Sequence, residues 1–175
     1  MSDSPSLFTA SLIEIKKQVD GLREAALQRF LTQARKAVGL SGDVSLLLTS
    51  NREMRALNRN FRGKDKPTDV LSFPAVDAVA ARFAGDLAIS VDIAAVNARD
   101  LRHTVENEVR ILILHGLLHL AGYDHEADAG QMARKESRLR NALGLPSTLI
   151  ERSIGKPAVS KKAKIRSSIR KRRAR

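Results

Sequence analysis

Three of the four histidines in this chain lie in one short segment, HGLLHLAGYDH, which runs from His115 to His125. His115 and His119 are four residues apart, so in an α-helix both side chains would project from the same face, one turn apart. Gly122 can end such a helix, because glycine adopts the left-handed conformation that reverses the chain at little cost. The turn would bring His125 back as a third ligand. Three neutral imidazoles with an open position for water are typical of a catalytic zinc site, whereas closed structural sites usually include cysteine, which this chain lacks.

The same histidines also permit a structural interpretation, because a histidine on an apolar helix face is often packed and hydrogen-bonded. The full spacing, H-x-x-x-H-x-x-G-x-x-H, favours the metal, since it is the spacing of the zinc helix and turn of the metzincin proteases. In those enzymes a glutamate follows the first histidine and acts as general base towards the zinc-bound water. Here that position is Gly116, which has no side chain to accept a proton. The segment therefore predicts the metal site of these proteases without their base.

The net charge of +12 is concentrated in the last residues of the chain. Residues 156–175 hold ten of the 31 Lys and Arg residues and no acid, which leaves 21 basic against 19 acidic side chains elsewhere, a net of +2. Self-repulsion predicts that such a tail is disordered on its own. It could neutralise RNA phosphates, or it could serve only solubility. We expect one functional domain over residues 1–150 and a basic tail over 151–175.

Alternating strand and helix patterns run through the first 150 residues. We expect strands over 9–16, 44–48, 68–73 and 84–90, and helices over 21–38, 51–59, 91–101, 105–121 and 126–143. The helix over 105–121 carries the first two histidines and is apolar nearly all round, which predicts that it is buried. No segment is long and apolar enough to span a membrane, and residues 1–12 lack the basic region of a secretory signal. We therefore expect a cytoplasmic protein.

Two separate segments resemble one known protein family. The first is HGLLHLAGYDH, and the second is LNRNFRGKDKPTDVLSFP, from Leu57 to Pro74, followed by a strand with Gly85-Asp86-Leu87. Over residues 43 to about 144 the chain resembles the YbeY family of bacterial metal-dependent endoribonucleases. The resemblance implies an α/β (α+β) fold in a single small domain, with a mixed sheet of about four strands and about five helices. It also implies an enzyme for single-stranded RNA that works with the small ribosomal subunit, in 16S rRNA 3′-end maturation and ribosome quality control.

The resemblance also assigns roles to residues of this chain. The family's three metal ligands correspond to His115, His119 and His125, and its functional arginine corresponds to Arg62. We expect one Zn²⁺ ion, although other divalent transition metals also accept imidazole. As a mechanistic hypothesis, the ion held by His115, His119 and His125 activates water, and the guanidinium of Arg62 stabilises charge on the phosphate. Without a glutamate at 116, the proton could pass to the substrate phosphate, to Asp124 or another nearby acid, or nowhere beyond the metal. Attack by the RNA 2′-hydroxyl, with the metal mainly as an electrostatic clamp, remains the alternative. From the residues alone, Arg62 could equally be a surface side chain in a loop.

Other polar residues near the two segments have more than one possible role. Asp69, Asp86 and Asp124 could hold a turn or a strand end, or accept a hydrogen bond from a ligand histidine. His103 lies outside the motif and is expected to be structural. Three apolar residues at helical spacing are expected to pack the last helix: Met132, Leu139 and Leu143.

Two other functions remain open on the sequence. A metallopeptidase would use the same zinc spacing, but Gly116 argues against it. A noncatalytic ribosome-assembly factor would hold a structural metal with its histidines and bind RNA with its tail.

Overall fold

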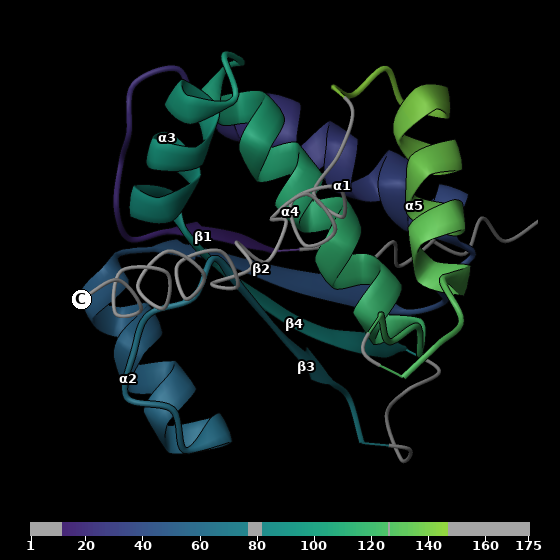
Figure 1. Ribbon diagram of the computed structural model, residues 1–175, viewed down its shortest axis with the longest axis horizontal. Helices are drawn as coiled ribbons and strands as arrows, with labels where there is room; N and C mark the ends of the chain where they lie inside the picture. Colours follow the sequence, from purple (N-terminus) through teal and green to yellow (C-terminus); the bar gives the residue numbers. More distant parts are fainter. Residues whose placement is uncertain (1–11, 77–81, 126, 147–175) are drawn as a thin grey trace, which may run out of the picture.

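A four-stranded mixed sheet forms the centre of the fold (Figure 1). The computed structural model describes residues 12–76, 82–125 and 127–146. The strands lie in the order β1-β2-β4-β3; β1 (Ile13–Ile15), β2 (Asp43–Thr49) and β4 (Phe83–Ser90) are parallel, and β3 (Val70–Pro74) is antiparallel to β4. The two edges of the sheet are therefore β1 and β3.

Helices cover the two faces of the sheet unequally (Figure 1). One face carries α1 (Glu24–Val38), α3 (Val91–Asp100), α4 (Val105–Leu120) and α5 (Gln131–Ala142), and the other face carries α2 (Asn51–Arg62). Side chains along a strand alternate between the faces, which separates two groups of apolar residues. Leu46 and Leu48 belong to the main core under the four helices, whereas Leu47 packs against a smaller cluster that includes Met54 of α2.

Helix α4 is almost entirely buried, as its sequence predicts. The side chain of Thr104 begins it by accepting a hydrogen bond from the backbone N–H of Asn107. Between Val109 and Leu118, all but two residues are buried. After the helix, Gly122 takes the left-handed conformation (φ 86°), and its N–H donates to the carbonyl oxygen of His119. The predicted helix end at this glycine is confirmed.

The predicted elements are confirmed, with differences at their ends. Helix α2 runs to Arg62, three residues beyond the prediction, and the strand predicted over 9–16 is present at Ile13–Ile15, with residues 9–11 outside the described part of the chain. The helix predicted over 126–143 begins only at Gln131, so its predicted start is wrong. The carboxylate of Asp128 accepts hydrogen bonds from the backbone of the three residues that open the helix, Gly130, Gln131 and Met132, and this turn replaces the expected helical one.

The sequence also predicts the basic tail and the absence of a membrane span. The basic tail over 151–175 lies outside the described residues, so the domain boundary at 150 stays a prediction. Within the described ranges, no helix combines the length and the apolar character needed to cross a membrane.

Candidate metal site

The three predicted ligands meet at the C-terminal end of α4. His115 and His119 project from its last turns, and His125 returns after the reversal at Gly122. One potential ligand atom from each histidine lies within 4.8 Å of the other two. The Nε2 atoms of His115 and His119 are 3.2 Å apart, and the ring of His125 lies 5.4 and 5.3 Å from their rings, centroid to centroid. This cluster, the histidine triad, could hold one metal ion.

A buried carboxylate fixes the ring of His115. Nδ1 of His115 lies 2.9 Å from Oε2 of Glu136 on α5, and the two side chains are 13% and 2% exposed. A carboxylate only accepts hydrogen bonds, so Nδ1 carries the proton and donates it, and Nε2 is the bare nitrogen that faces the triad. This tautomer is the one that a metal requires, and metal-binding histidines commonly have such a partner.

An arginine in turn holds that carboxylate. Nη2 of Arg140, one turn further along α5, lies 2.7 Å from Oε1 of Glu136, and both side chains are almost fully buried. Burial alone would raise the pKa of Glu136, but the hydrogen bond from His115 and the positive charge of Arg140 outweigh it and lower that pKa. Glu136 is therefore an ionised carboxylate at neutral pH.

The position of His119 keeps its imidazole neutral. Desolvation by burial is the largest cause that lowers its pKa to about 4, and the neighbouring His115 and His125 act in the same direction. The charge of Asp124 and a hydrogen bond to the backbone of Tyr123 oppose these effects without outweighing them. A neutral imidazole is the form that binds a metal, so protons compete little for this nitrogen at neutral pH.

Close packing occupies the position of the protease base. A Cβ atom at Gly116 would lie 2.7 Å from Cδ2 of Leu87 and 3.3 Å from Oγ of Ser72. The hydroxyl of Ser72 also donates a hydrogen bond to the carbonyl oxygen of Gly116, at 3.3 Å. The glycine thus lets α4 approach β3 and β4 more closely than any side chain would allow, and the histidine triad is fixed against the sheet.

Arg62 and the first two histidines of the triad come from helices on opposite faces of the sheet. Arg62 is the last residue of α2, on the face of the sheet opposite α4, and its side chain is exposed (Figure 1). Its neighbours Arg55 and Arg59 both pair with Asp65. In the described part of the chain, no hydrogen bond or ion pair holds Arg62. Within the described ranges, no hydrogen bond or ion pair joins the predicted arginine to the predicted ligands.

Edge strand β3 lies between Arg62 and the histidine triad. On one side, Phe61 packs edge-on against Phe73 of β3, with ring centroids 5.0 Å apart. On the other side, Ser72 makes the hydrogen bond to Gly116, next to His115. The two predicted parts of the site therefore flank the same short stretch of one edge strand.

Among the described residues, neither Asp69 nor Asp86 makes a hydrogen bond to a ligand histidine. Asp69 accepts hydrogen bonds from the N–H of Val70 and the hydroxyl of Thr68, at 2.9 and 3.2 Å, which is the strand-end role. Asp86 is exposed on the face of the sheet that α2 shares. Asp124 affects the triad through its charge on His119.

Glu136 is the residue that the sequence interpretation missed. Its position carries a signal, because Met132, Glu136 and Leu139 follow one helical stripe and all three are buried. A carboxylate within an apolar stripe needs a partner in the core. His103 has a similar partner, with Nε2 2.8 Å from Oε2 of the fully buried Glu108, and its predicted structural role agrees with this position.

Comparisons with known proteins complete the description of the site. A family model described as Endoribonuclease YbeY matches residues 8–144. The chain is 57% identical over 148 residues to Endoribonuclease YbeY of Koribacter versatilis (84% of this chain, 94% of that protein) and 46% identical over 142 residues to that of Solibacter usitatus (81% and 94%). The solution structure of TM1509 from Thermotoga maritima is 30% identical, with a TM-score of 0.51 over 87% of this chain and 100% of that one. The chain belongs to the YbeY family of endoribonucleases.

Proposed function

We propose that this protein is a metal-dependent endoribonuclease that cuts single-stranded RNA at the histidine triad. The observation that carries the proposal is the meeting of three imidazole ligand atoms within 4.8 Å in a chain of this family. The donor set suits zinc, because His119 is neutral and His115 presents its bare Nε2. Other divalent transition metals accept the same ligands. A bound ion would acidify a water molecule and polarise a phosphoryl oxygen.

The residues around the histidine triad would position it and handle protons. Glu136 holds the ring of His115 through Nδ1, and Arg140 holds Glu136. Because Gly116 provides no carboxylate, the proton from the attacking water needs another acceptor. Asp124 is suited to this role, since its charge already acts on His119.

Arg62 would bind the RNA rather than the metal site directly. Its guanidinium is exposed and offers several donors in a fork that matches phosphate oxygens. An RNA strand that crosses edge strand β3 would meet Arg62 on one side and the histidine triad on the other. Arg62 would thus hold the backbone across the edge while the phosphodiester next to the triad is cut, and stabilise charge on phosphate oxygens.

The biological role follows from the family relationship. We propose that the substrate is ribosomal RNA on the small subunit, that the reaction serves 16S rRNA 3′-end maturation and ribosome quality control, and that it occurs in the cytoplasm. The catalytic domain would span residues 1–150. The basic tail over 151–175, with its excess of positive charge, would add affinity for RNA phosphates.

Cleavage of one defined single-stranded RNA, with the metal content measured for each variant, tests the proposal. We expect His115→Ala to lose both metal and cleavage. We expect Arg62→Ala to keep its metal and to cut at least tenfold more slowly, since a charged phosphate contact is lost. Arg52→Ala is the matched control, because Arg52 is also exposed but lies in the first turn of α2.

Three results would contradict the proposed function. Equal cleavage by all variants would indicate a contaminating nuclease. Chelator-sensitive proteolysis of casein without RNA cleavage would indicate a metallopeptidase. A wild-type protein that binds metal and RNA but never cuts would indicate an assembly factor.

A further inference from the structure

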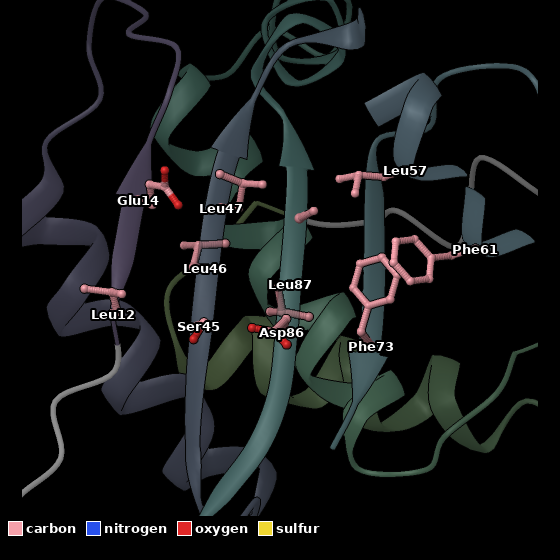
Figure 2. A pocket seen from close by; sticks show the side chains of 11 residues that line it. Leu12, Glu14, Ser45, Leu46, Leu47, Leu57, Phe61, Phe73, Asp86 and Leu87 are labelled. Atoms are coloured by element: carbon pink, nitrogen blue, oxygen red, sulfur yellow. The ribbon is translucent and has the colours of Figure 1, made fainter. Parts of the chain in front are cut away.

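A hollow of about 470 Å³ lies on the face of the sheet that carries α2 (Figure 2). We call it the sheet hollow. Strands β1, β2, β4 and β3 form its floor, and α2 forms one side. The residues that matter here are Glu14, Leu47, Leu57, Phe61, Phe73 and Asp86. A hollow of this size has room for one nucleobase, and bases are bound in proteins by apolar walls with a few polar groups.

The aromatic end of the sheet hollow offers a stacking surface. Phe61 is 66% exposed although it is large and apolar, and its ring meets that of Phe73 at 66°. Figure 2 shows the two rings next to each other, from α2 and from β3. Exposed aromatic rings are the usual stacking surfaces for unpaired RNA bases.

A carboxylate lies on the strand next to Phe73. Asp86 on β4 is the cross-strand partner of Phe73 on β3, which places their Cβ atoms about 5 Å apart. The carboxylate is exposed in a hollow that is otherwise mainly apolar on this side. It would repel a phosphate, but it can accept hydrogen bonds from the N–H groups of a base. Guanine fits best, because its N1–H and N2–H point in the same direction and can donate to the two oxygens of one carboxylate.

The sheet hollow is also continuous with the residues proposed to bind RNA. Phe61 directly precedes Arg62, and Phe73 directly follows Ser72, whose hydroxyl is bonded to Gly116 of the metal-site helix. A base stacked on the ring of Phe61 would therefore have its phosphates near Arg62 and near edge strand β3. The charges fit this arrangement, because the guanidinium of Arg62 would lie near the phosphates and the carboxylate of Asp86 would face the base.

We propose that the sheet hollow binds one guanine base of the RNA substrate, stacked on the exposed ring of Phe61, with Phe73 beside it, and hydrogen-bonded to Asp86. The proposal rests on the proposed function and adds sequence preference to it. Glu14 lies outside the base site, at the opposite end of the hollow on β1, with β2 between it and β4 (Figure 2).

Mononucleotides test the base site without any cleavage. The full-length, metal-loaded protein is titrated with GMP, IMP, AMP, CMP and UMP, followed by amide NMR shifts. IMP is the sharpest comparison, because it differs from GMP only in lacking the N2 amino group. We expect GMP to bind about tenfold more tightly than IMP, the size of effect that one added hydrogen bond to a charged group gives.

Three variants assign the binding to its residues. Asp86→Asn should remove the preference for GMP over IMP, and Phe61→Leu should weaken both nucleotides about tenfold by loss of stacking. Glu14→Gln removes the same charge from the other end of the hollow and should bind as the wild type does. Phe61 is exposed, so its variant should fold, which thermal melting checks.

The outcomes separate this proposal from the proposed function. The base site is overturned, and the nuclease proposal left intact, if the protein cuts RNA but shows no saturable binding of GMP. Equal GMP affinity of the wild type and the Asp86→Asn variant has the same meaning. The hollow would then suit a protein partner. GMP binding that depends on Asp86 and Phe61 supports the base site even in a protein that does not cut RNA, and in that case the nuclease proposal fails instead.

Discussion

A row of three side chains runs from the histidine triad into the core, formed by His115, Glu136 and Arg140. A buried ion pair is costly to desolvate, and a well-packed apolar pair would often be as stable. This pair contacts a ligand histidine and determines its tautomer. On the proposed function, the row would fix the nitrogen of His115 that faces the metal, and its contribution to the free energy of unfolding would be secondary.

Glu136→Gln should lower the affinity for zinc by about 10- to 100-fold, the usual effect of removing such a partner. The neutral amide is a weaker acceptor for Nδ1–H, and it removes the negative charge that lies against Arg140. A competition titration against a zinc chelator measures the affinity, and the visible spectrum of the cobalt-substituted protein reports the ligand geometry.

Glu108→Gln is the matched control for this prediction. Glu108 is fully buried and holds His103 as Glu136 holds His115, but at the other end of α4. We expect this variant to lose stability and keep the affinity for zinc. Equal loss of affinity in both variants would mean that Glu136 acts only through stability.

The metal-free protein should lose stability as the pH falls, because of His119. The pKa of its imidazole is about 4 in the folded chain and 6.5 when the ring is fully hydrated, as in the unfolded chain. Between these values the unfolded chain binds a proton that the folded chain does not, so the free energy of unfolding decreases as the pH is lowered. The contribution of His119 to stability is fully present above pH 6.5. Urea denaturation with a chelator present, across this pH window, measures the slope. The slope should be smaller in His119→Gln, and equal slopes would disprove the assignment.

At the scale of elements, α5 determines where the carboxylate for His115 lies. Asp128 sets the start of this helix by accepting hydrogen bonds from the N–H groups of Gly130, Gln131 and Met132, at 2.7, 2.9 and 2.8 Å. These bonds, that from Met132 most of all, lower the pKa of Asp128, so the carboxylate is ionised at neutral pH. The turn before α5 thus controls the position of Glu136, two turns later.

Asp128→Ala should lower the melting temperature by a few degrees, because three backbone donors at the start of α5 lose their acceptor. We also expect a smaller loss of zinc affinity, since the first turn of α5 would fray. Differential scanning calorimetry and the chelator titration measure the two effects. Asp100→Ala is the control: the Asp100 side chain is 59% exposed and, among the residues that the structure describes, pairs only with the adjacent Arg99, so the variant should change neither quantity. A melting temperature equal to that of the wild type would contradict the role of Asp128.

The sequence predicts those features of the elements that depend on residues close together in the chain. His115, His119 and Gly122 lie within eight residues, so helical spacing and one turn define their arrangement, and the apolar residues of α4 predict its burial. Glu136 is 21 residues from His115 and on another helix, so only tertiary packing brings them together. The start of α5 escaped prediction because the side chain of Asp128 forms a turn in a stretch whose composition also suits a helix.

Arg62 shows a second limit of prediction from sequence. Its motif is recognisable, but its distance from the histidine triad depends on the order of the strands. Strand β3 lies at the edge of the sheet beyond β4, and α2 lies on the other face from α4. Periodicity within a segment does not show on which face of a sheet a helix packs.

At the scale of the whole molecule, the excess positive charge lies in a different part of the chain from the proposed site residues. Residues 1–155 carry 21 basic and 19 acidic side chains, whereas 156–175 carry ten basic side chains and no acid. A nearly neutral domain gains little from long-range attraction to RNA, while a basic segment attached to it raises the encounter rate and the affinity without selecting a sequence. On the proposals above, selection would then come from the sheet hollow and the histidine triad.

Replacing the ten Lys and Arg residues of 156–175 by Gln should weaken binding to single-stranded RNA and make it less dependent on salt. Each phosphate contact that is lost should reduce the slope of log K against log salt by about 0.7. Fluorescence anisotropy with a metal-free protein and a labelled oligonucleotide, over a series of salt concentrations, measures both. The rate of cleavage at saturating RNA should stay that of the wild type, because the triad, Arg62 and the sheet hollow are unchanged. A salt dependence identical to that of the wild type would show that the tail serves only solubility, and a lost rate at saturation would place the tail in the catalytic site.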